Sequence, residues 1–278
     1  MGDPMRKFAF SGLAIAAVLA GSAPAAAQGD LIIAPTRLVL DGRRGGEVIL
    51  SNIGTKDASY RVTLELRRMQ PDGTLEDVAP EQVNATEKAA LEMVRYAPRR
   101  VTLPPDQPQS IRVSARPGPE VPDGEYRVHL TFNAVPDTQT LEQQQQEAAP
   151  GDGFSINLTP IYGITMPIII RKGVVSATAS LSNPRITQSS RGPAFEIEMS
   201  RSGTASVYGD LVVTRQGSNE PVFLARGIGI YPEITQRHVS FALTPEQASL
   251  IRGPVRVEYR EPVQTGAALI AGTDVTLP

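Results

Sequence analysis

The chain has 278 residues, and its 27 Lys and Arg against 29 Asp and Glu give a formal net charge of −2, so no overall attraction draws it to nucleic acid or an anionic membrane. The absence of cysteine and the presence of only two histidines exclude disulfides, thiol catalysis and cysteine-based zinc sites. The 41% of hydrophobic residues is typical of a folded protein, and the length suits two domains.

The N-terminal segment, residues 1–27, has the three parts of a secretory signal peptide. Two basic residues precede an apolar run at 8–20, and small residues continue to Ala27. Ala25 and Ala27 form the small-x-small site that a signal peptidase accepts, and the apolar run is shorter than the about 20 residues that cross a bilayer. We therefore expect cleavage after Ala27 and export of the remainder. The alternative is an uncleaved anchor.

Beyond this segment the dominant pattern has a period of two, which is typical of strands that bury one face. Apolar and polar residues alternate at 60–67, 126–133, 195–199 and 255–260. Turn sequences such as Pro71-Asp72-Gly73 separate the strands. Helical signals are confined to residues 81–94 and to 244–247, where Thr244 resembles an N-cap followed by Pro245. Shorter strands are expected at 47–52, 109–113, 209–213, 221–225 and 238–243. The pattern predicts an all-β protein built from antiparallel sandwiches.

A polar stretch at 136–153, which includes four consecutive glutamines, predicts a loop. After it, every even position of one long run is apolar: Phe154, Ile156, Leu158, Pro160, Tyr162, Ile164, Met166, Ile168 and Ile170. At about 3.3 Å per residue this run would extend roughly 56 Å, which exceeds a common strand of about 20 Å. Pro160 and Pro167 have no N–H to donate, which favours an edge strand. Such an edge aggregates unless something covers it, although a kinked core strand is the alternative.

Several segments, in this order, resemble the PapD-like periplasmic pilus chaperones. Residues 31–40, in which Thr36-Arg37 precedes apolar residues, are similar to the family's first strand, and 103–113 are similar to its turn into a Gln-x-x-Arg strand. Gly124-Glu125-Tyr126, followed by Asn133-Ala134-Val135-Pro136, matches the family in residue type at both ends of the span. The polar loop before a long alternating strand also falls at the family's position. The resemblance covers nearly the whole chain after the signal segment.

The resemblance implies two immunoglobulin-like antiparallel β-sandwich domains in an L or boomerang arrangement. The N-terminal domain would span 28–171 and include a long donor strand at 154–171, and the C-terminal domain would span 172–278. The implied function is that of a periplasmic chaperone, which binds incompletely folded pilus or fimbrial subunits by donor-strand complementation and delivers them to an outer-membrane usher. Whether the free protein associates with itself is left open.

The family's pattern assigns roles to a few residues here. Arg37 matches an arginine that holds the subunit's C-terminal carboxylate, although Pro167 stands where the family has a second, lysine anchor. Glu125 and Arg171 match an interdomain ion pair. The alternatives are a solvent-exposed Arg37 and a weak surface pair of under about 1 kcal/mol. The donor-strand side chains would be Phe154, Ile156, Leu158, Tyr162 and Ile164, each worth roughly 1.5–3 kcal/mol when buried in a subunit.

Enzymatic functions find little support. His129 falls on the polar face of its strand and His238 begins another, so both are expected at the surface. No segment resembles a nucleophile elbow or a phosphate-binding loop. We expect no catalytic residue, no metal, no cofactor, no nucleic acid and no small-molecule substrate. A structural or adhesive fibre component and a chaperone of a non-pilus client are the alternatives; the first strand begins soon after Ala27, which favours a chaperone over a fibre subunit with a free N-terminal extension.

Overall fold

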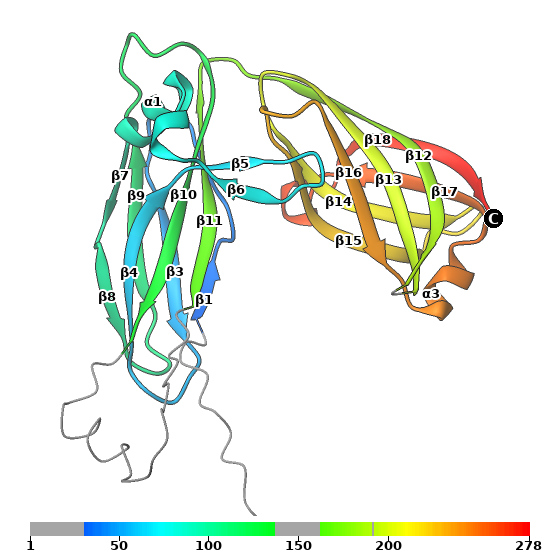
Figure 1. Cartoon of the computed structure of the whole chain (residues 1–278), viewed down its shortest axis with the longest axis horizontal. Helices are drawn as coiled ribbons and strands as arrows, with labels where there is room; N and C mark the ends of the chain where they lie inside the picture. Colours follow the sequence, from blue (N-terminus) through cyan, green and yellow to red (C-terminus); the bar gives the residue numbers. More distant parts are fainter. Residues whose placement is uncertain (1–30, 137–161, 191) are drawn as a thin grey trace, which may run out of the picture.

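The computed structural model describes residues 31–136, 162–190 and 192–278. Strands dominate these residues and build two lobes, which are set at an angle to one another like the arms of an L (Figure 1). Within the described ranges, α-helix is confined to α1 (Ala85–Met93) and α3 (Pro245–Leu250). The predicted all-β fold of two immunoglobulin-like sandwiches is confirmed. The expected signal peptide lies outside the described residues.

The first lobe packs two sheets against each other. One sheet has the order β1 (Leu31–Ala34), β3 (Gly46–Asn52), β9 (Gln109–Ala115) and β7 (Val94–Ala97). The other has the order β2 (Leu38–Leu40), β11 (Gly163–Lys172), β10 (Gly124–Val135), β4 (Ala58–Glu65) and β8 (Arg100–Leu103). These orders follow the A-B-E-D and G-F-C arrangements of an immunoglobulin domain. The first strand therefore crosses between the sheets, as β1 in one and β2 in the other.

The second lobe repeats the plan with different strand lengths. One sheet has the order β12 (Ala177–Ser189), β13 (Gly192–Gly203) and β16 (Gln236–Ala242), and the other β15 (Pro221–Ile230), β14 (Val207–Arg215), β17 (Gly253–Arg260) and β18 (Leu269–Leu277). Short 3-10 turns lie at Pro80–Gln82 and Val263–Thr265. The chain passes between the lobes at 173–176. Gly173 has φ +68, and a Cβ there would lie 2.0 Å from Asp123 Oδ2, so this junction requires glycine.

The period-two pattern predicted the inward face of the main strands. The buried side chains on these strands include Tyr60, Val62, Tyr126, Val128, Leu130, Phe132, Phe195, Ile197, Met199, Val255, Val257 and Tyr259. They form one apolar core in each lobe. Helix α1 lies at one end of the first lobe and begins with a capping box, in which Asn84 Oδ1 accepts from the Glu87 N–H and Glu87 Oε2 accepts from the Asn84 N–H, both at 2.9 Å.

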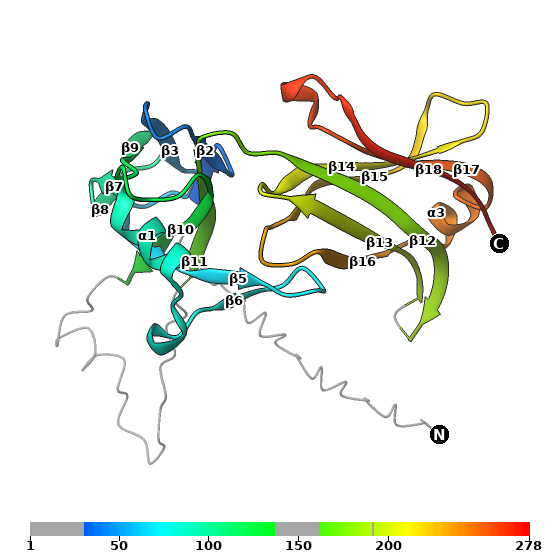
Figure 2. The ribbon, with the colours of Figure 1, turned by 90° about the horizontal axis from the view of Figure 1, so that it is seen from above.

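A hairpin of β5 (Arg67–Met69) and β6 (Leu75–Asp77) leaves the first lobe and reaches to the second, as both ribbon views show (Figures 1 and 2). Its turn is the predicted Pro71-Asp72-Gly73 sequence, with Gly73 at φ +86. Asp72 Oδ1 accepts from the Thr74 N–H at 2.8 Å and closes the turn. The hairpin is therefore a defined connection between the lobes as well as a surface extension of the first one.

Candidate functional site

Strand β11 has a partly unpaired edge. Along its whole length it pairs with β10, from Gly163 opposite Asn133 to Lys172 opposite Gly124. On the other side, β2 pairs with it in parallel only at 168–170. Within the described residues, 163–167 therefore have a strand partner on one side only. Pro167 lies in this segment, at the place for which its missing N–H predicted an edge.

The apolar row along this strand divides into two parts with different surroundings. Tyr162 is 55% exposed and Ile164 is 38% exposed, so apolar surface accompanies the unpaired edge. Met166, Ile168 and Ile170 are at most 1% exposed and belong to the core of the first lobe. For these three residues the core-strand alternative holds. The other predicted donor-strand residues, Phe154, Ile156 and Leu158, lie outside the described part of the chain.

A cleft of about 1300 Å³ lies between the lobes. On the side of the first lobe it is lined by the segment that joins β1 to β2, including Arg37, and by Arg171 at the end of β11. On the side of the second lobe it is lined by β14, β15 and the β17–β18 connection, including Tyr208 and Arg226. The unpaired part of β11 and the cleft thus belong to one strand: its start carries the open edge, and its end forms part of the cleft wall.

Arg37 is a half-buried cation at the cleft wall. Its guanidinium lies over the ring of Tyr208 from the other lobe, with Cζ 4.0 Å from the ring centroid. Its Nε and Nη2 atoms are buried and have no hydrogen-bond partner within the described residues. Burial lowers the pKa of Arg37, and the positive charge of Arg171 lowers it further, against the opposing effects of Tyr231, Tyr208 and Glu125. Arg37 therefore lies in the cleft with unused hydrogen-bond donors.

Glu125 and Arg171 are brought together at the junction of the lobes. Arg171 Nε donates to Glu125 Oε2 at 3.0 Å, and Arg171 Nη2 donates to the carbonyl of Ser206 in the second lobe at 3.4 Å. The Glu125 side chain is 1% exposed, so this is a buried contact on the glutamate side. Arg37 and Arg171 face one carboxylate here, and the cluster of these three side chains has an excess positive charge.

The expected surface position of His129 is wrong. The residue is 1% exposed, and neither ring nitrogen has a hydrogen-bond partner in the described residues. It lies on β10 between Glu65 of β4 and Pro167 of β11, on the sheet face opposite to the core. Burial lowers its pKa from 6.5 to about 3, with smaller effects of Arg127 and Arg67. The alternation of β10 predicted two faces, but not that a hairpin and a second lobe cover the polar one.

Two other contacts between distant segments were not predicted. Arg127 on β10 forms an ion pair with Glu233 of the second lobe, which lies 106 residues away in the chain. Ile169, at an odd position of the alternating run, is 0% exposed and packs with Met69 and Tyr231 at the junction of the lobes. Arg127 lies on the polar face of its strand and Glu233 lies in a loop, and no sequence pattern indicates that the two side chains pair.

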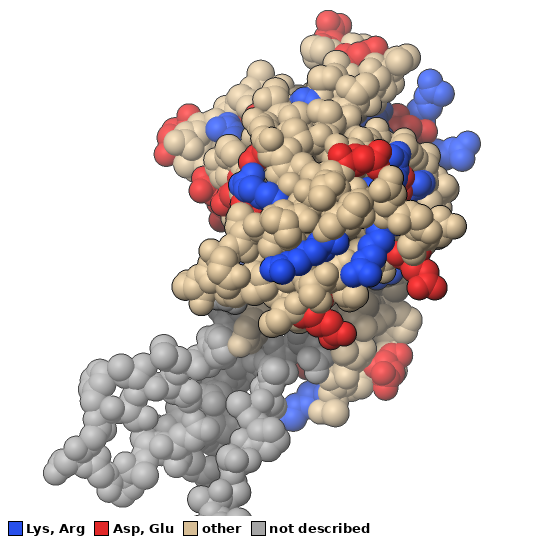
Figure 3. Space-filling model, turned by 90° about the vertical axis from the view of Figure 1, so that its right-hand side faces the viewer, with Lys and Arg blue, Asp and Glu red and all other residues tan. Residues whose placement is uncertain are grey.

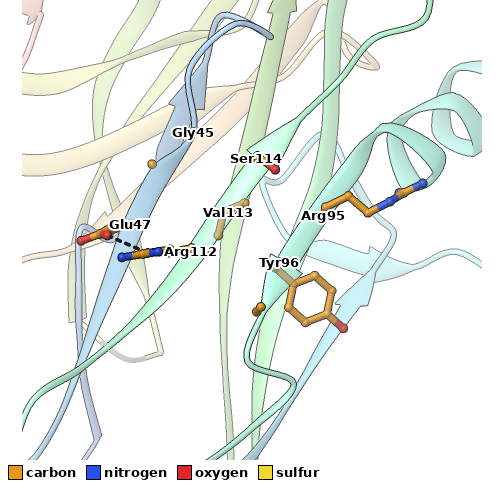
Figure 4. A pocket seen from close by; sticks show the side chains of 9 residues that line it. Gly45, Glu47, Arg95, Tyr96, Arg112, Val113 and Ser114 are labelled. Carbon is orange, nitrogen blue, oxygen red and sulfur yellow. Dashed lines mark hydrogen bonds and ion pairs between the residues drawn. The ribbon is translucent and has the colours of Figure 1, made fainter.

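A second depression, of about 460 Å³, lies on the outer face of the β1-β3-β9-β7 sheet near Gly45 and Tyr96 (Figure 4). Its ion pair, Arg112 Nε to Glu47 Oε1 at 3.4 Å, joins two exposed side chains. No buried polar atom without a partner lines it among the described residues. On the end of the molecule shown in Figure 3, basic and acidic side chains are interspersed, so this face presents no patch of a single charge. The cleft remains the stronger candidate.

The described residues contain neither a metal-binding cluster nor a membrane-spanning helix. No group of three or more His, Cys, Asp or Glu side chains is placed to hold a metal ion in this part of the chain. Likewise, none of the helices described here has both the length and the apolar character needed to cross a membrane.

No model of a known protein family matches the chain, and no curated protein matches it. Among solved structures it is similar to the CsuC-CsuE chaperone-tip adhesion subunit complex from Csu pili of Acinetobacter baumannii, with 10% identity, a TM-score of 0.45, and coverage of 90% of this chain and 100% of the other. It is also similar to the Pseudomonas aeruginosa CupB2 chaperone, with 12% identity, a TM-score of 0.45, and coverage of 89% and 100%. The E. coli chaperone DraB is a third similar structure, with 13% identity, a TM-score of 0.43, and coverage of 89% of this chain and 96% of the other.

Proposed function

We propose that the protein is a periplasmic chaperone that binds incompletely folded pilus or fimbrial subunits and delivers them to an outer-membrane usher. The single observation that carries the proposal is the combination, on one strand, of an unpaired edge with exposed apolar side chains and an end that borders the cleft in which Arg37 lies. The sequence motifs that resemble the PapD-like chaperones support the same function.

The edge of β11 supplies the first part of the mechanism. A strand whose N–H and C=O groups lack partners on one side can add a strand from another chain, largely without regard to that chain's sequence. Exposed Tyr162 and Ile164 lie beside this edge. Together with the predicted donor residues Phe154, Ile156 and Leu158, they would enter the groove of a subunit that lacks one strand of its own sandwich. Each such side chain contributes roughly 1.5–3 kcal/mol when it is fully removed from water.

The cleft supplies the second part. Arg37 presents buried N–H donors without partners, and the positive charge of Arg37 and Arg171 exceeds the negative charge of Glu125. A subunit that ends in a free carboxylate would balance this charge. The missing lysine of the family pattern leaves Arg171 and the exposed Arg226 as the other basic side chains of the cleft wall. Binding the chain end in the cleft would fix the register of the subunit's last strand along β11.

Nothing in this mechanism requires bond-making or bond-breaking by the protein, so no catalytic residue and no cofactor are assigned. Export by the signal segment at 1–27 would place the protein in the periplasm, where pilus subunits pass. The donor side chains and the carboxylate site act together: the edge provides most of the affinity, and the cleft provides the register.

Co-expression with candidate subunits, followed by native mass measurement, tests the proposal. We expect complexes that contain one copy of this protein and one subunit, and subunits that are lost to aggregation when this protein is absent. A ladder of oligomers of this protein alone, with no subunit bound, would instead indicate a fibre component and overturn the proposal. One-to-one complexes with an exported protein unrelated to pili would support the chaperone function but show that the client is not a pilus subunit.

A further inference from the structure

The β5–β6 hairpin reaches the second lobe through backbone as well as side-chain contacts. The His238 N–H, on edge strand β16, donates to the Pro71 carbonyl at the hairpin turn at 2.8 Å. The Met69 N–H donates to Glu233 Oε1, also at 2.8 Å. Met69 packs with Ile169 and Tyr231 in a small apolar cluster at the junction, in which each is at most 7% exposed. This contact therefore combines two hydrogen bonds to the hairpin backbone with a buried apolar cluster.

Glu233 ties this hairpin to the first lobe's sheet as well. Its carboxylate forms an ion pair with Arg127, whose side chain is 8% exposed, and its Oε1 accepts from the hairpin's Met69 N–H. Arg127 Nη2 in turn donates to the Arg67 carbonyl at the base of the hairpin, at 2.9 Å. Glu233 of the second lobe thus binds both the hairpin, through Met69, and strand β10, through Arg127. Removal of Glu233 would leave the largely buried Arg127 side chain without this ion-pair partner.

The loop that presents Glu233 is held rigidly by its own lobe. Arg201, 7% exposed, donates to the Pro232 carbonyl from Nη2 at 3.2 Å and to the Ile234 carbonyl from Nε at 3.4 Å. The backbone N–H of Arg201 also donates to the Thr235 carbonyl at 2.8 Å. These bonds flank Glu233 on both sides, so movement of Glu233 relative to the second lobe requires breaking them.

Tyr231 connects these contacts to the cleft. The Arg127 guanidinium lies over its ring, with Cζ 3.6 Å from the centroid. Tyr231 is also close enough to Arg37 for the two groups to influence each other's charge, and Arg37 itself lies over Tyr208. The hairpin contacts and the carboxylate site therefore share one aromatic residue at the junction, and both Tyr208 and Tyr231 belong to the second lobe.

We propose that residues 67–77, together with Glu233, form a strap that fixes the angle between the lobes and thereby holds Arg37 in position at the cleft. The part concerning Arg37 rests on the proposed function, whereas the fixing of the angle does not. Without the strap, the lobes would be joined by the 173–176 connection, by the Arg171 and Arg37 contacts, and by the packing of Tyr231 against Arg127 and Ile169. The cleft would then sample a wider range of openings.

Interlobe distances measured by electron spin resonance test the strap in the full, unliganded protein. Because the chain has no cysteine, Thr55→Cys and Asn219→Cys place one spin label on an exposed loop of each lobe and nowhere else. We expect one narrow distance distribution, which broadens at least about twofold in width when Met69→Ala and Glu233→Ala are combined. Glu233→Gln, which keeps the acceptor for the Met69 N–H but removes the charge, should broaden it less.

Glu76→Gln is the matched control, because Glu76 is an exposed hairpin residue whose carboxylate accepts from Gln70 within the hairpin. It should leave the distribution unchanged. Circular dichroism of each variant shows whether both lobes remain folded. A wild-type distribution in the folded Met69→Ala, Glu233→Ala variant, or in Glu233→Gln if the double variant does not fold, would overturn the strap. Failure of the wild-type protein to bind any subunit would overturn the proposed function and leave the distance result intact.

Discussion

The final strands of the two lobes have different edges. Strand β18 of the second lobe pairs with β17 over 269–277, and it carries Asp274, whose carboxylate binds Arg256 at 2.9 Å. Strand β11 of the first lobe has no charged residue between 162 and 170, and its unpaired part begins beside exposed Tyr162 and Ile164. The last strands of the two sandwiches thus differ in whether their open edge carries a charged side chain.

Charged side chains on an edge strand discourage the addition of another strand, because pairing would bury them. The second lobe has this protection, and the unpaired segment of the first lobe does not. The unprotected edge is therefore a property of one strand and not of the fold, which both lobes share. It follows that changes at β11 should affect subunit binding, whereas equivalent changes on the edges of the second lobe should not.

The largest effect is expected from a charge on the unprotected edge. Ile164→Glu would place a carboxylate where an apolar side chain meets the subunit, and we expect subunit affinity to fall at least about 100-fold. Leu224→Glu on edge strand β15 is the matched control, because Leu224 is 40% exposed and Ile164 38%. Titration calorimetry with a purified subunit measures both. Equal losses in the two variants would break the comparison between the lobes.

A smaller loss of affinity is expected at the cleft. Arg37→Ala removes the guanidinium charge that would meet the subunit's carboxylate, and we expect affinity to fall by about 10- to 100-fold, the effect of a charge-assisted hydrogen bond. Arg226→Ala, at an exposed position of the same cleft, should change it by less than about 3-fold. A subunit with an amidated C-terminus should bind the wild-type protein and the Arg37→Ala variant with the same affinity. Unchanged affinity of Arg37→Ala would refute the carboxylate site.

The buried histidine of the first lobe should make the free energy of unfolding depend on pH. His129 of the first lobe is buried with a pKa of about 3, whereas the unfolded chain has a His pKa of 6.5, so the unfolded state binds the extra proton first as pH falls. This one group should lower the free energy of unfolding by about 2 kcal/mol between pH 7.5 and pH 5. Urea denaturation at the two pH values measures the loss.

His129→Leu should remove most of this pH dependence, while His238→Gln, on the partly exposed outer face of the second lobe, serves as the control. If the His129→Leu protein loses as much stability at pH 5 as the wild type, the buried imidazole is not the cause.

The smallest effect is expected at the protected edge. Asp274→Asn removes one partner of Arg256, which still donates to Glu258 Oε1 at 2.9 Å. Because Asp274 is exposed, the loss of unfolding free energy should stay below about 1 kcal/mol, and subunit affinity should not change. A marked gain or loss of affinity would mean that the second lobe's edge also takes part in binding.

The sequence was sufficient for features that depend on local pattern. The alternation in β4, β10, β13 and β17 identified the strands and their inward faces, since a buried face at every second residue leaves a clear period. The N-cap at Thr244 was likewise predicted from adjacent residues. Of the candidate site, Arg37 was identified as a residue, and the structure adds that its guanidinium lies on Tyr208.

Features that depend on contact between distant segments could not be predicted in this way. The period of two in β10 separates two faces but does not show that the second face is covered, which is why His129 was expected at the surface. The same holds for Ile169, and for the hairpin at 67–77, whose five charged residues resemble a solvated turn. The pairing of Arg127 with Glu233 joins residues 106 positions apart, and no pattern of spacing records it.

Hydrogen exchange of the β11 backbone tests whether this edge receives a strand from a subunit. The amides to compare are those of Gly163–Met166 that face away from β10, in the free protein and in its complex with a subunit. Pairing with a subunit strand predicts exchange at least about 100-fold slower in the complex, with no change along β15 or β18. Exchange rates that are the same in both states, in a complex that forms, would contradict the account.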